Sequence, residues 1–183
     1  VGVKTPIGVI EVTPFRTESG YTDGRRPDTV CFSRNIEDDL GRRDFSINAI
    51  AYNPLLKTFV DPFNGQKDIK DRILRAVGNP KDRFSEDGLR IMRLFRFVSQ
   101  LEFMIDPATL QAAFDCKEIL AKVSKERTHD EFVKMLMSKN PAPAFMYMEK
   151  VEILPYLSKH LQEAVGVKQN GSHEYVVYEH LVR

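Results

Sequence analysis

Cysteine is scarce in the sequence, and long apolar runs are absent from it. The two cysteines, Cys31 and Cys116, lie far apart and form no CxxC motif, which argues against a disulfide scaffold and for a reducing compartment. We expect both to be core residues. No apolar run approaches the length of a membrane span, and no signal peptide is recognisable. A soluble, cytoplasmic protein without membrane contact is therefore expected.

A strong net charge of either sign is also missing. Lys and Arg number 27 and Asp and Glu number 26, so no global basic field indicates a nucleic-acid partner. Any contact with nucleic acid must come from local clusters of charge. The 183 residues suffice for one good core or for parts of two. Because the sequence starts at Val1 rather than Met and stops at Arg183 inside a helical pattern, we expect a fragment.

The most informative stretch is residues 84–98, which the spacing predicts to be one long helix. A helix advances about 100° per residue, so one face collects Asp87, Arg90, Ile91, Leu94, Val98 and Leu101. Buried charges persist only when they pair with each other or with a bound group. Arginine recurs every three residues along the helix and forms a slanted basic ridge, at Arg90, Arg93 and Arg96.

An aspartate and an arginine held side by side on this helix can read the edge of a base. The carboxylate of Asp87 would accept from the amino group that C and A carry, while Arg90 would donate to a ring acceptor. U and G present a carbonyl at that place, so the pair would select C and A together. The alternative is an ordinary amphipathic core helix with an internal ion pair and solvated arginines.

A second polar cluster surrounds Asp44. This residue stands where an N-cap would stand, ahead of a short helix predicted over residues 45–51. Asp44 and Asn48 are i,i+4 neighbours and can face one ligand. Arg42 and Arg43 at the helix start suit a triphosphate, because the first helical amides would point to the same place. A plain helix cap beside two surface arginines explains the same residues.

The remaining pattern indicates a mixed α+β class. Short β-branched and aromatic runs predict strands at residues 7–15, 28–33 and 58–60. A polar, glycine-punctuated loop is predicted over residues 16–27. Further helices are predicted over residues 67–75, from Pro107 onwards, and over residues 124–136.

Taken in order, these stretches resemble the class II tRNA nucleotidyltransferase family, which contains CCA-adding enzymes and bacterial poly(A) polymerases. The motifs that match are the flexible loop at residues 21–27, Arg42–Ala49 (RRDFSINA against the family's RRDFTINA), Asp61–Asp68 (a DPxxGxxD hinge), Glu86–Phe97 (EDxLRxxRxxRF) and Ser124–Lys134 (the last motif). Ser46 replaces the usual Thr, and Thr128 stands where the last motif has an apolar residue.

The resemblance implies an α+β fold in three parts. Residues 1–65 would be the C-terminal part of a truncated nucleotidyltransferase α/β head whose sheet lacks its opening strands. Residues 66–140 would form a mostly helical neck with the base-recognition motif, and the hinge at residues 61–68 would let the head move on it. Residues 141–183 would begin a helical body, HD-like in type, with His180 near its first expected ligand.

The resemblance also implies a nucleotide-binding site. The residues that would hold the triphosphate and ribose are Arg43, Asp44 and Asn48. The residues that would read C or A are Asp87 and Arg90. The arginines that would support the triphosphate or this amino-acid template are Arg93 and Arg96.

By the same resemblance, the protein would add CMP and AMP to the 3′ end of tRNA, using CTP, ATP and Mg²⁺. The family holds its metal ions on a catalytic DxD pair, and no such pair occurs in this sequence. We therefore expect no catalytic residue and no metal ligand within the chain. Alone it is expected to be inactive and to bind nucleotide weakly.

Other functions remain compatible with these residues. A poly(A) polymerase of the same family, or an enzyme that adds A alone or C alone, would use the same pair, although the near-neutral charge favours a tRNA enzyme. A non-catalytic helical RNA-binding module is the alternative from a different class. It is disfavoured because the charges gather at helix starts rather than along one basic face. An HD phosphohydrolase would need a His-Asp pair in the helical body, and residues 141–183 contain none.

Overall fold

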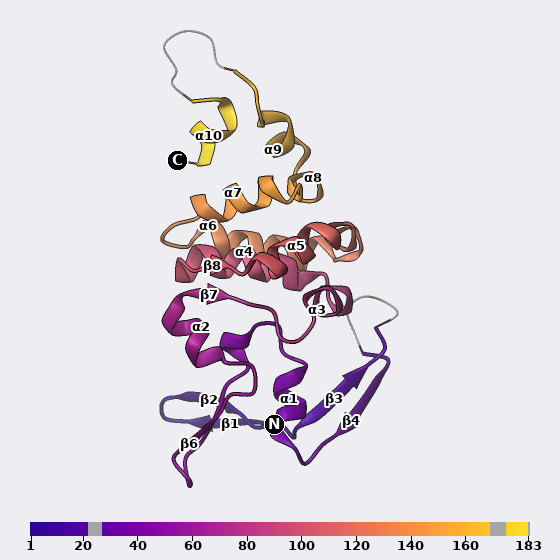
Figure 1. Ribbon diagram of the computed structural model, residues 1–183, viewed down its shortest axis with the longest axis vertical. Coiled ribbons are helices and arrows are strands. Elements are labelled where there is room, and N and C mark those ends of the chain that lie inside the picture. Colours follow the sequence, from indigo (N-terminus) through magenta and orange to yellow (C-terminus); the bar gives the residue numbers. More distant parts are fainter. Residues whose placement is uncertain (22–26, 169–174, 183) are drawn as a thin grey trace.

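The structure is a computed structural model that describes residues 1–21, 27–168 and 175–182. The strands and the first short helices form one end of an elongated molecule, and a stack of helices forms the rest (Figure 1). The N-terminus lies among the strands, and α10 lies at the far end of the stack. Within the described ranges, no helix combines the length and the apolar character needed to cross a membrane.

Antiparallel hairpins build the strand-rich end. The pairs are β1 (Gly2–Thr5) with β2 (Gly8–Glu11), β3 (Arg16–Ser19) with β4 (Thr29–Phe32), and β5 (Ala51–Asn53) with β6 (Thr58–Val60). The strand predictions are confirmed at β2, β4 and β6. The loop predicted over residues 16–27 starts too early, because β3 pairs with β4 along its whole length.

Helices make up most of the remaining chain. Near the strands lie α1 (Ile36–Gly41), the 3-10 turn η1 (Ser46–Asn48) and α2 (Gly65–Asp71). The middle of the stack contains α3 (Pro80–Glu86), α4 (Leu89–Leu101), α5 (Pro107–Asp115), the 3-10 helix η2 (Lys117–Lys122) and α6 (Lys125–Leu136). Its end contains α7 (Ala142–Lys150), α8 (Leu154–Leu157), α9 (Lys159–Ala164) and α10 (Val177–Val182). The mixed α+β class and the helices α5 and α6 agree with prediction.

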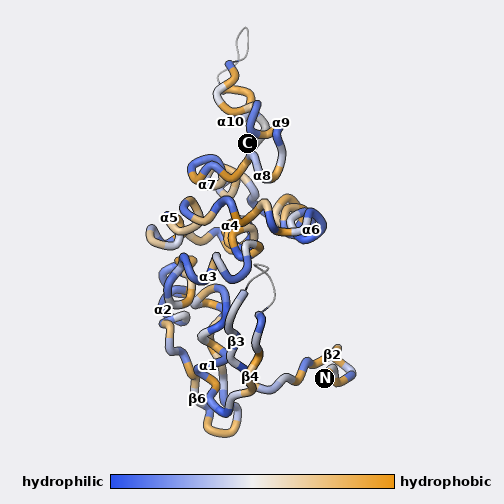
Figure 2. Tube along the Cα trace, turned by 90° about the vertical axis from the view of Figure 1, so that its right-hand side faces the viewer, coloured by the Kyte–Doolittle hydropathy of each residue, from blue (hydrophilic) through white to orange (hydrophobic). Residues whose placement is uncertain are grey.

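The strands at this end expose apolar side chains. Phe32 on β4 is 78% exposed, and Val9 and Ile10 on β2 are exposed as well. Figure 2 shows the β1–β2 hairpin projecting away from the rest of the chain.

Cys31 on β4 is exposed and Cys116 is partly buried, so the prediction of a core position is wrong for Cys31. A two-stranded hairpin without a second layer has no buried face in which to place such a residue.

The segment around Asp44 does not form the predicted capped helix. Phe45 is extended and fully buried, and the N–H of Ser46 donates to the carbonyl oxygen of Arg75 at 2.9 Å. The N–H of Val77 donates in turn to the carbonyl oxygen of Asp44 at 3.0 Å. Because this pairing with residues 75–77 holds the backbone extended, Asp44 caps no helix and only the turn η1 follows it.

The helix predicted over residues 84–98 is interrupted between α3 and α4. Asp87 is extended, with φ −145° and ψ 107°, and Gly88 follows it. A Cβ atom on Gly88 would lie 2.8 Å from Cγ2 of Ile119 and 2.9 Å from Cγ2 of Val123. The chain after α5 therefore packs directly on this backbone, and the break lets α3 pack on α5 while α4 packs on α6 and α7.

The core lies along the buried face of α4. Ile91 and Val98 are buried there as predicted, whereas Leu101 at the helix end is exposed. Figure 2 shows α4 in the middle of the helical stack. At the far end, the hydroxyl of Tyr178 donates to the carbonyl oxygen of Phe145 at 2.9 Å, so α10 is tied to α7.

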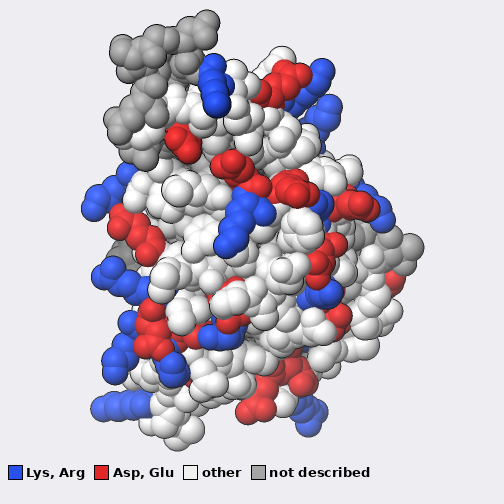
Figure 3. Space-filling view, turned by 45° about the horizontal axis from the view of Figure 1, so that its top comes forward, with Lys and Arg blue, Asp and Glu red and all other residues white. Residues whose placement is uncertain are grey.

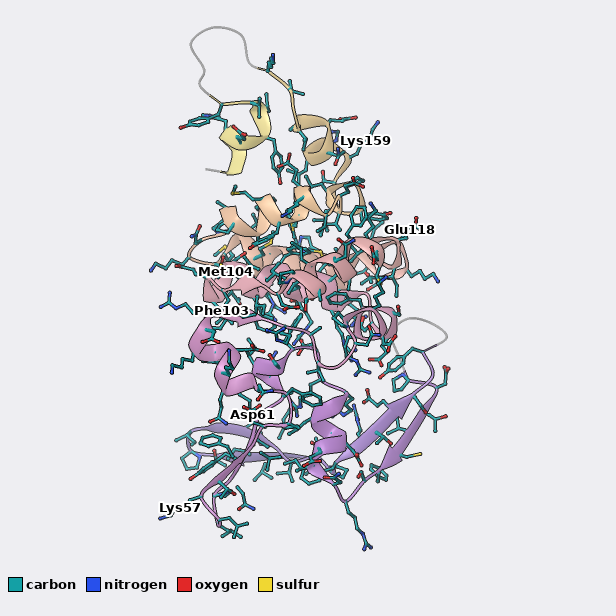
Figure 4. The ribbon with its side chains drawn as sticks, in the orientation of Figure 1. Lys57, Asp61, Phe103, Met104, Glu118 and Lys159 are labelled. Carbon is teal, nitrogen blue, oxygen red and sulfur yellow. The ribbon has the colours of Figure 1, made fainter. Side chains whose placement is uncertain are left out.

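A short parallel ladder joins the strand-rich end to the helices. β7 (Ile73–Leu74) pairs with β8 (Met104–Ile105), which directly precedes α5. Figure 4 labels Met104 at this junction and Asp61 on the strand-rich side of it. The helix predicted over residues 67–75 ends at Asp71, because Arg72 adopts the left-handed conformation with φ 55° and the chain then enters β7.

Arg75 connects the two parts through its guanidinium. Its Nε donates to Oδ2 of Asp68 on α2 at 3.2 Å, and its Nη1 donates to Oδ1 of Asp106 at 2.5 Å. Asp68 is only 2% exposed and also accepts from the hydroxyl of Ser46 at 2.7 Å. A carboxylate buried this deeply needs its cationic partner.

We predict that Arg75→Met lowers the free energy of unfolding by about 1–3 kcal/mol, because a buried acceptor then lacks its charged donor. Urea denaturation followed by circular dichroism measures the loss. Lys67→Met is the matched control, since it removes an ion pair with Asp71 on the exposed side of α2 and should leave the midpoint unchanged. Equal losses in both variants would contradict the role given to Arg75.

Candidate functional site

A cavity of about 500 Å³ opens where the first half of the chain meets α4 and α6. Its lining is polar and rich in arginine, and consists of Arg42, Arg43, Asp44, Asn48, Asp87, Leu89, Arg90, Arg93, Phe97 and Arg127. The fold therefore brings together the predicted residues Arg43, Asp44, Asn48, Asp87, Arg90 and Arg93. Arg96 is not part of the lining.

The carboxylate of Asp44 is held from both sides. Its Oδ1 accepts from the N–H of Phe45 at 2.9 Å and from Nδ2 of Asn48 at 3.0 Å. Its Oδ2 accepts from Nε of Arg93 on α4 at 2.7 Å. The predicted proximity of Asp44 and Asn48 is thus a direct hydrogen bond, which orients the amide of Asn48 at the edge of the cavity.

Arg42 and Arg43 differ in how closely carboxylates pair with them. Nη2 of Arg42 lies 2.7 Å from Asp39 and its Nη1 lies 3.1 Å from Glu18. Arg43 is 46% exposed, and its contact with Asp39 is longer, at 3.3 Å. Burial acts to raise the pKa of the Asp39 carboxyl, but hydrogen bonds from both arginines outweigh it and hold that pKa below its ordinary value. Arg43 is therefore available to an anion in the cavity.

Asp87 pairs with Arg127 rather than with Arg90. Its Oδ2 accepts from Nη2 of Arg127 at 2.8 Å, and its Oδ1 lies 3.3 Å from Nη1 of the same guanidinium. Oδ1 also accepts from the N–H of Leu89 at 3.0 Å. The predicted side-by-side pair of Asp87 and Arg90 is wrong in this respect. Asp87 lies in the extended break before α4, so the spacing of a continuous helix does not apply to it.

Arg90 binds the first half of the chain instead. Its Nη2 donates to the carbonyl oxygen of Arg42 at 3.0 Å, and its Nη1 donates to the carbonyl oxygen of Arg83 at 2.8 Å and to Glu86. Glu86 pairs with Arg83 as well, and Arg83 donates to the carbonyl oxygen of Gly41 at 2.9 Å. These bonds fix Arg90 at the wall of the cavity.

Arg96 lies outside the cavity lining and contacts it through Phe97. It pairs with Glu131 of α6 and donates to Oε1 of Gln100 at 2.8 Å. Its guanidinium carbon lies 4.2 Å from the centroid of the Phe97 ring, and that of Arg93 lies 5.5 Å from the same centroid. Arg96 thus supports Phe97, a lining residue, and does not reach the cavity itself.

Arg127 is the charged lining residue from the last motif that the predicted nucleotide site omits, and the apolar residues Leu89 and Phe97 are omitted as well. The motif around Arg127 was recognisable, since Ser124–Arg127 precedes Glu131 at the start of α6. Its partner Asp87 lies 40 positions earlier, and no local pattern indicates a pairing at that separation. Arg83 and Glu86 escape prediction for a similar reason, because their contacts with Gly41 and Arg42 depend on how the two halves dock.

Charges outside the cavity are mixed. Figure 3 shows acidic and basic side chains interspersed over the face it presents. Among the described residues, no group of three or more His, Cys, Asp and Glu side chains is arranged to hold a metal ion. Asp44, Glu86 and Asp87 are each paired with arginine, so these carboxylates do not fit Mg²⁺, which needs oxygen ligands of its own.

Tyr21 lies at the end of β3, close to the wall of the cavity. Its hydroxyl donates to Oε2 of Glu18 at 2.8 Å, and Glu18 also pairs with Arg42. Burial and the neighbouring Glu18 carboxylate raise the pKa of Tyr21 to about 12. The chain from residue 22 to residue 26, where most of the predicted flexible loop falls, lies outside the described residues.

Family models match two parts of this chain. A model described as the poly A polymerase head domain matches residues 1–75. A model described as the probable RNA and SrmB-binding site of polymerase A matches residues 102–165. The cavity lies between these parts, and it draws lining residues from both and from the start of α4.

Curated relatives are similar over most of the chain. The CCA-adding enzyme of Lactobacillus helveticus is 48% identical over 159 residues, which are 87% of this chain and 39% of that protein. The CCA-adding enzyme of Enterococcus faecalis is 45% identical over 157 residues, 86% of this chain and 38% of that protein. The chain thus spans about two-fifths of the length of the curated relatives that it matches.

Solved structures share the fold. The CCA-adding enzyme of Bacillus stearothermophilus in complex with CTP superposes with a TM-score of 0.75 at 39% identity, over 86% of this chain and 38% of that one. The CCA-adding enzyme of Thermotoga maritima complexed with tRNA superposes with a TM-score of 0.62 at 29% identity, over 70% of this chain and 34% of that one.

We predict that Tyr21→Phe removes a phenol transition near pH 12 from an ultraviolet absorbance titration. The fold favours the neutral phenol, so its stabilising effect is complete below pH 10 and disappears as the pH rises to about 12. Tyr52→Phe is the control, since Tyr52 is exposed on β5 and lies outside the cavity. Burial raises the pKa of Tyr178 even further, so its transition stays in both variants. A transition near pH 12 of unchanged amplitude in Tyr21→Phe would show that Tyr21 does not produce it.

Proposed function

Because the chain belongs to the family of tRNA nucleotidyltransferases and poly(A) polymerases, we propose that it carries the nucleotide-recognition part of an enzyme that adds CMP and AMP to the 3′ end of tRNA. The observation that carries this proposal is the arginine-rich cavity in which Asp44 and Asp87 are each paired with an arginine from a distant element. Such a cavity suits a ligand that combines a polyanion with a hydrogen-bonding base.

The triphosphate would lie against Arg43. This side chain is about half exposed and weakly engaged, so it can turn toward a phosphate at little cost. A guanidinium binds phosphate oxygens through two parallel N–H groups, which adds geometric specificity to the charge. Asn48, held by Asp44 at 3.0 Å, would present its amide to the ribose.

Asp87 and Arg90 would read the base together. The N–H of Arg90 donates to the carbonyl oxygen of Asp87 at 3.0 Å, but the two side chains have different partners, Arg127 for Asp87 and Glu86 for Arg90. A carboxylate accepts from the amino group of C or A, and a guanidinium donates to the adjacent ring acceptor. U and G place a carbonyl opposite the carboxylate, and the desolvated mismatch disfavours them.

In the proposed reaction, the terminal 3′ hydroxyl of the RNA attacks the α-phosphorus of the nucleotide, a phosphodiester forms and pyrophosphate leaves. We propose Mg²⁺ as the metal cofactor, which would supply activation of the hydroxyl and charge compensation for the leaving group. The arginine-paired carboxylates of this cavity do not fit that ion. The described residues would bind and orient the nucleotide. We propose the cytoplasm as the compartment in which the enzyme acts.

A poly(A) polymerase is the second candidate. The description of the head-domain model favours it, and a cavity that accepts A serves it equally well. The two functions differ in how many residues are added and on which RNA, so one incorporation experiment separates them.

The first test measures nucleotide incorporation by the chain extended to the length of its relatives, with tRNA lacking its 3′ end and with Mg²⁺. Incorporation of C and A, but not of U and G, is expected, because C and A alone satisfy Asp87 and Arg90. Ordered addition of C, C and A would identify CCA addition. Asp87→Ala and Arg90→Ala should admit U and G. Lys159→Ala is the control, since Figure 4 places Lys159 high in the helical stack. Long A tails on generic RNA would identify a poly(A) polymerase, and no incorporation would favour an RNA-binding module.

A second test isolates the triphosphate contact. We predict that Arg43→Met weakens CTP binding about tenfold, the loss expected for one charge-assisted hydrogen bond, without changing the thermal stability. Isothermal titration calorimetry measures the affinity. Arg34→Met serves as the control, because Arg34 is exposed and lies outside the cavity. Its substitution removes the same net charge as Arg43→Met. If both variants weaken binding equally, the effect belongs to net charge and Arg43 makes no contact.

A further inference from the structure

We propose that Arg127 is a positioning residue for base selection, which holds the carboxylate of Asp87 in the orientation that accepts the amino group of C or A. This inference rests on the proposed function, in which Asp87 reads the base. It assigns to the last motif of the chain a role in specificity that Asp87 and Arg90 do not have alone.

The local backbone supports the carboxylate of Asp87 at one oxygen only. Asp87 lies in the extended break between α3 and α4, where no helical neighbour restricts its side chain. The N–H of Leu89 holds one oxygen at 3.0 Å, which leaves the carboxylate free to turn about that bond. The two Nη atoms of Arg127, at 2.8 and 3.3 Å from the two oxygens, define the plane of the carboxylate. A planar fork on two oxygens is the geometry in which arginine restricts orientation.

Arg127 also balances charge inside the cavity. Asp87 and Arg127 both line it, and their side chains are 19% and 24% exposed. An unpaired carboxylate at this place would repel a triphosphate bound nearby. Arg127 removes that repulsion. Oδ1 of Asp87 already accepts from Leu89 and Arg127, whereas Oδ2 accepts one hydrogen bond, from Nη2 of Arg127, and so retains a lone pair for a ligand.

The position of Arg127 is itself secured by α6. One turn further along this helix, Glu131 pairs with Arg96 of α4. The two ion pairs have opposite polarity, with Arg127 of α6 paired to the break before α4 and Glu131 of α6 paired to α4 itself. The arrangement separates two roles, because the pair of Glu131 and Arg96 holds the helices together and does not touch Asp87.

The test compares the ratio of kcat/KM for CTP to that for UTP, in the chain extended to the length of its relatives, with tRNA lacking its 3′ end. Arg127→Met should lower this ratio at least about tenfold, the discrimination of one good bidentate contact. Arg127→Lys keeps the charge without the fork, so it should retain most of the kcat/KM for CTP and still lose the ratio. Glu131→Gln, which alters the neighbouring pair, should keep the ratio within about twofold.

Several outcomes would overturn the inference. An unchanged ratio in Arg127→Met, with all four nucleotides weakened alike, would make Arg127 a phosphate contact. The same loss of ratio in Glu131→Gln would make the effect one of helix packing. If Arg127→Met does not fold, Arg127→Lys decides by the same criterion. In an Asp87→Ala background, Arg127→Lys should change the ratio no further, and a further loss would contradict a role through Asp87.

Failure of the proposed function is distinguishable from failure of this inference. A wild-type protein that incorporates all four nucleotides equally would overturn the reading role of Asp87, and the inference with it. A wild-type protein that discriminates, together with an Arg127→Met variant that discriminates equally, would overturn the inference alone.

Discussion

The ion pair between Asp44 and Arg93 is the contact on which the cavity depends. It joins residues 49 positions apart, one in the strand-rich end and one in the central helix, at 2.6 Å. Arg90 and Arg83 reinforce it by donating to the carbonyl oxygens of Arg42 and Gly41. A buried pair of this kind adds little net stability over an apolar contact, but loss of one partner is costly. The cavity therefore exists only while the two halves are docked.

The same pairing explains how a chain with a net charge of +1 builds an arginine-rich site. Asp44, Glu86 and Asp87 each neutralise an arginine before any ligand arrives. Their charges largely cancel at long range, and Figure 3 shows acidic and basic side chains interspersed over the face it presents. Arg43, which pairs with Asp39 at the longer distance of 3.3 Å, keeps its charge available for the proposed triphosphate. Pre-paired groups also lose little freedom on binding, which favours selectivity over raw affinity.

The sequence was sufficient to predict which residues meet, and insufficient to predict how they pair. Six of the seven predicted residues line one cavity, because their motifs contain the right chemistry. The break before α4 was not predictable from spacing, since a single glycine, Gly88, rarely interrupts a helix unless another segment packs on it. Asp87 changed partners for that reason. The prediction of a capped helix at Asp44 was wrong because the backbone of residues 75–77 forms a β-bridge with the same segment.

The packing around Asp61 and Gly65 bears on the hinge predicted at residues 61–68. Asp61 accepts from the N–H groups of Gly65 and Gln66 at 2.6 and 2.9 Å, and a Cβ on Gly65 would lie 2.1 Å from the carbonyl oxygen of Ser46. This segment is therefore packed as one unit with η1. If the strand-rich end moves relative to α4, the bonds that must break include those from Arg83, Arg90 and Arg93 to residues 41–44. These are the bonds that shape the cavity, so any such movement would change the proposed base-reading site directly.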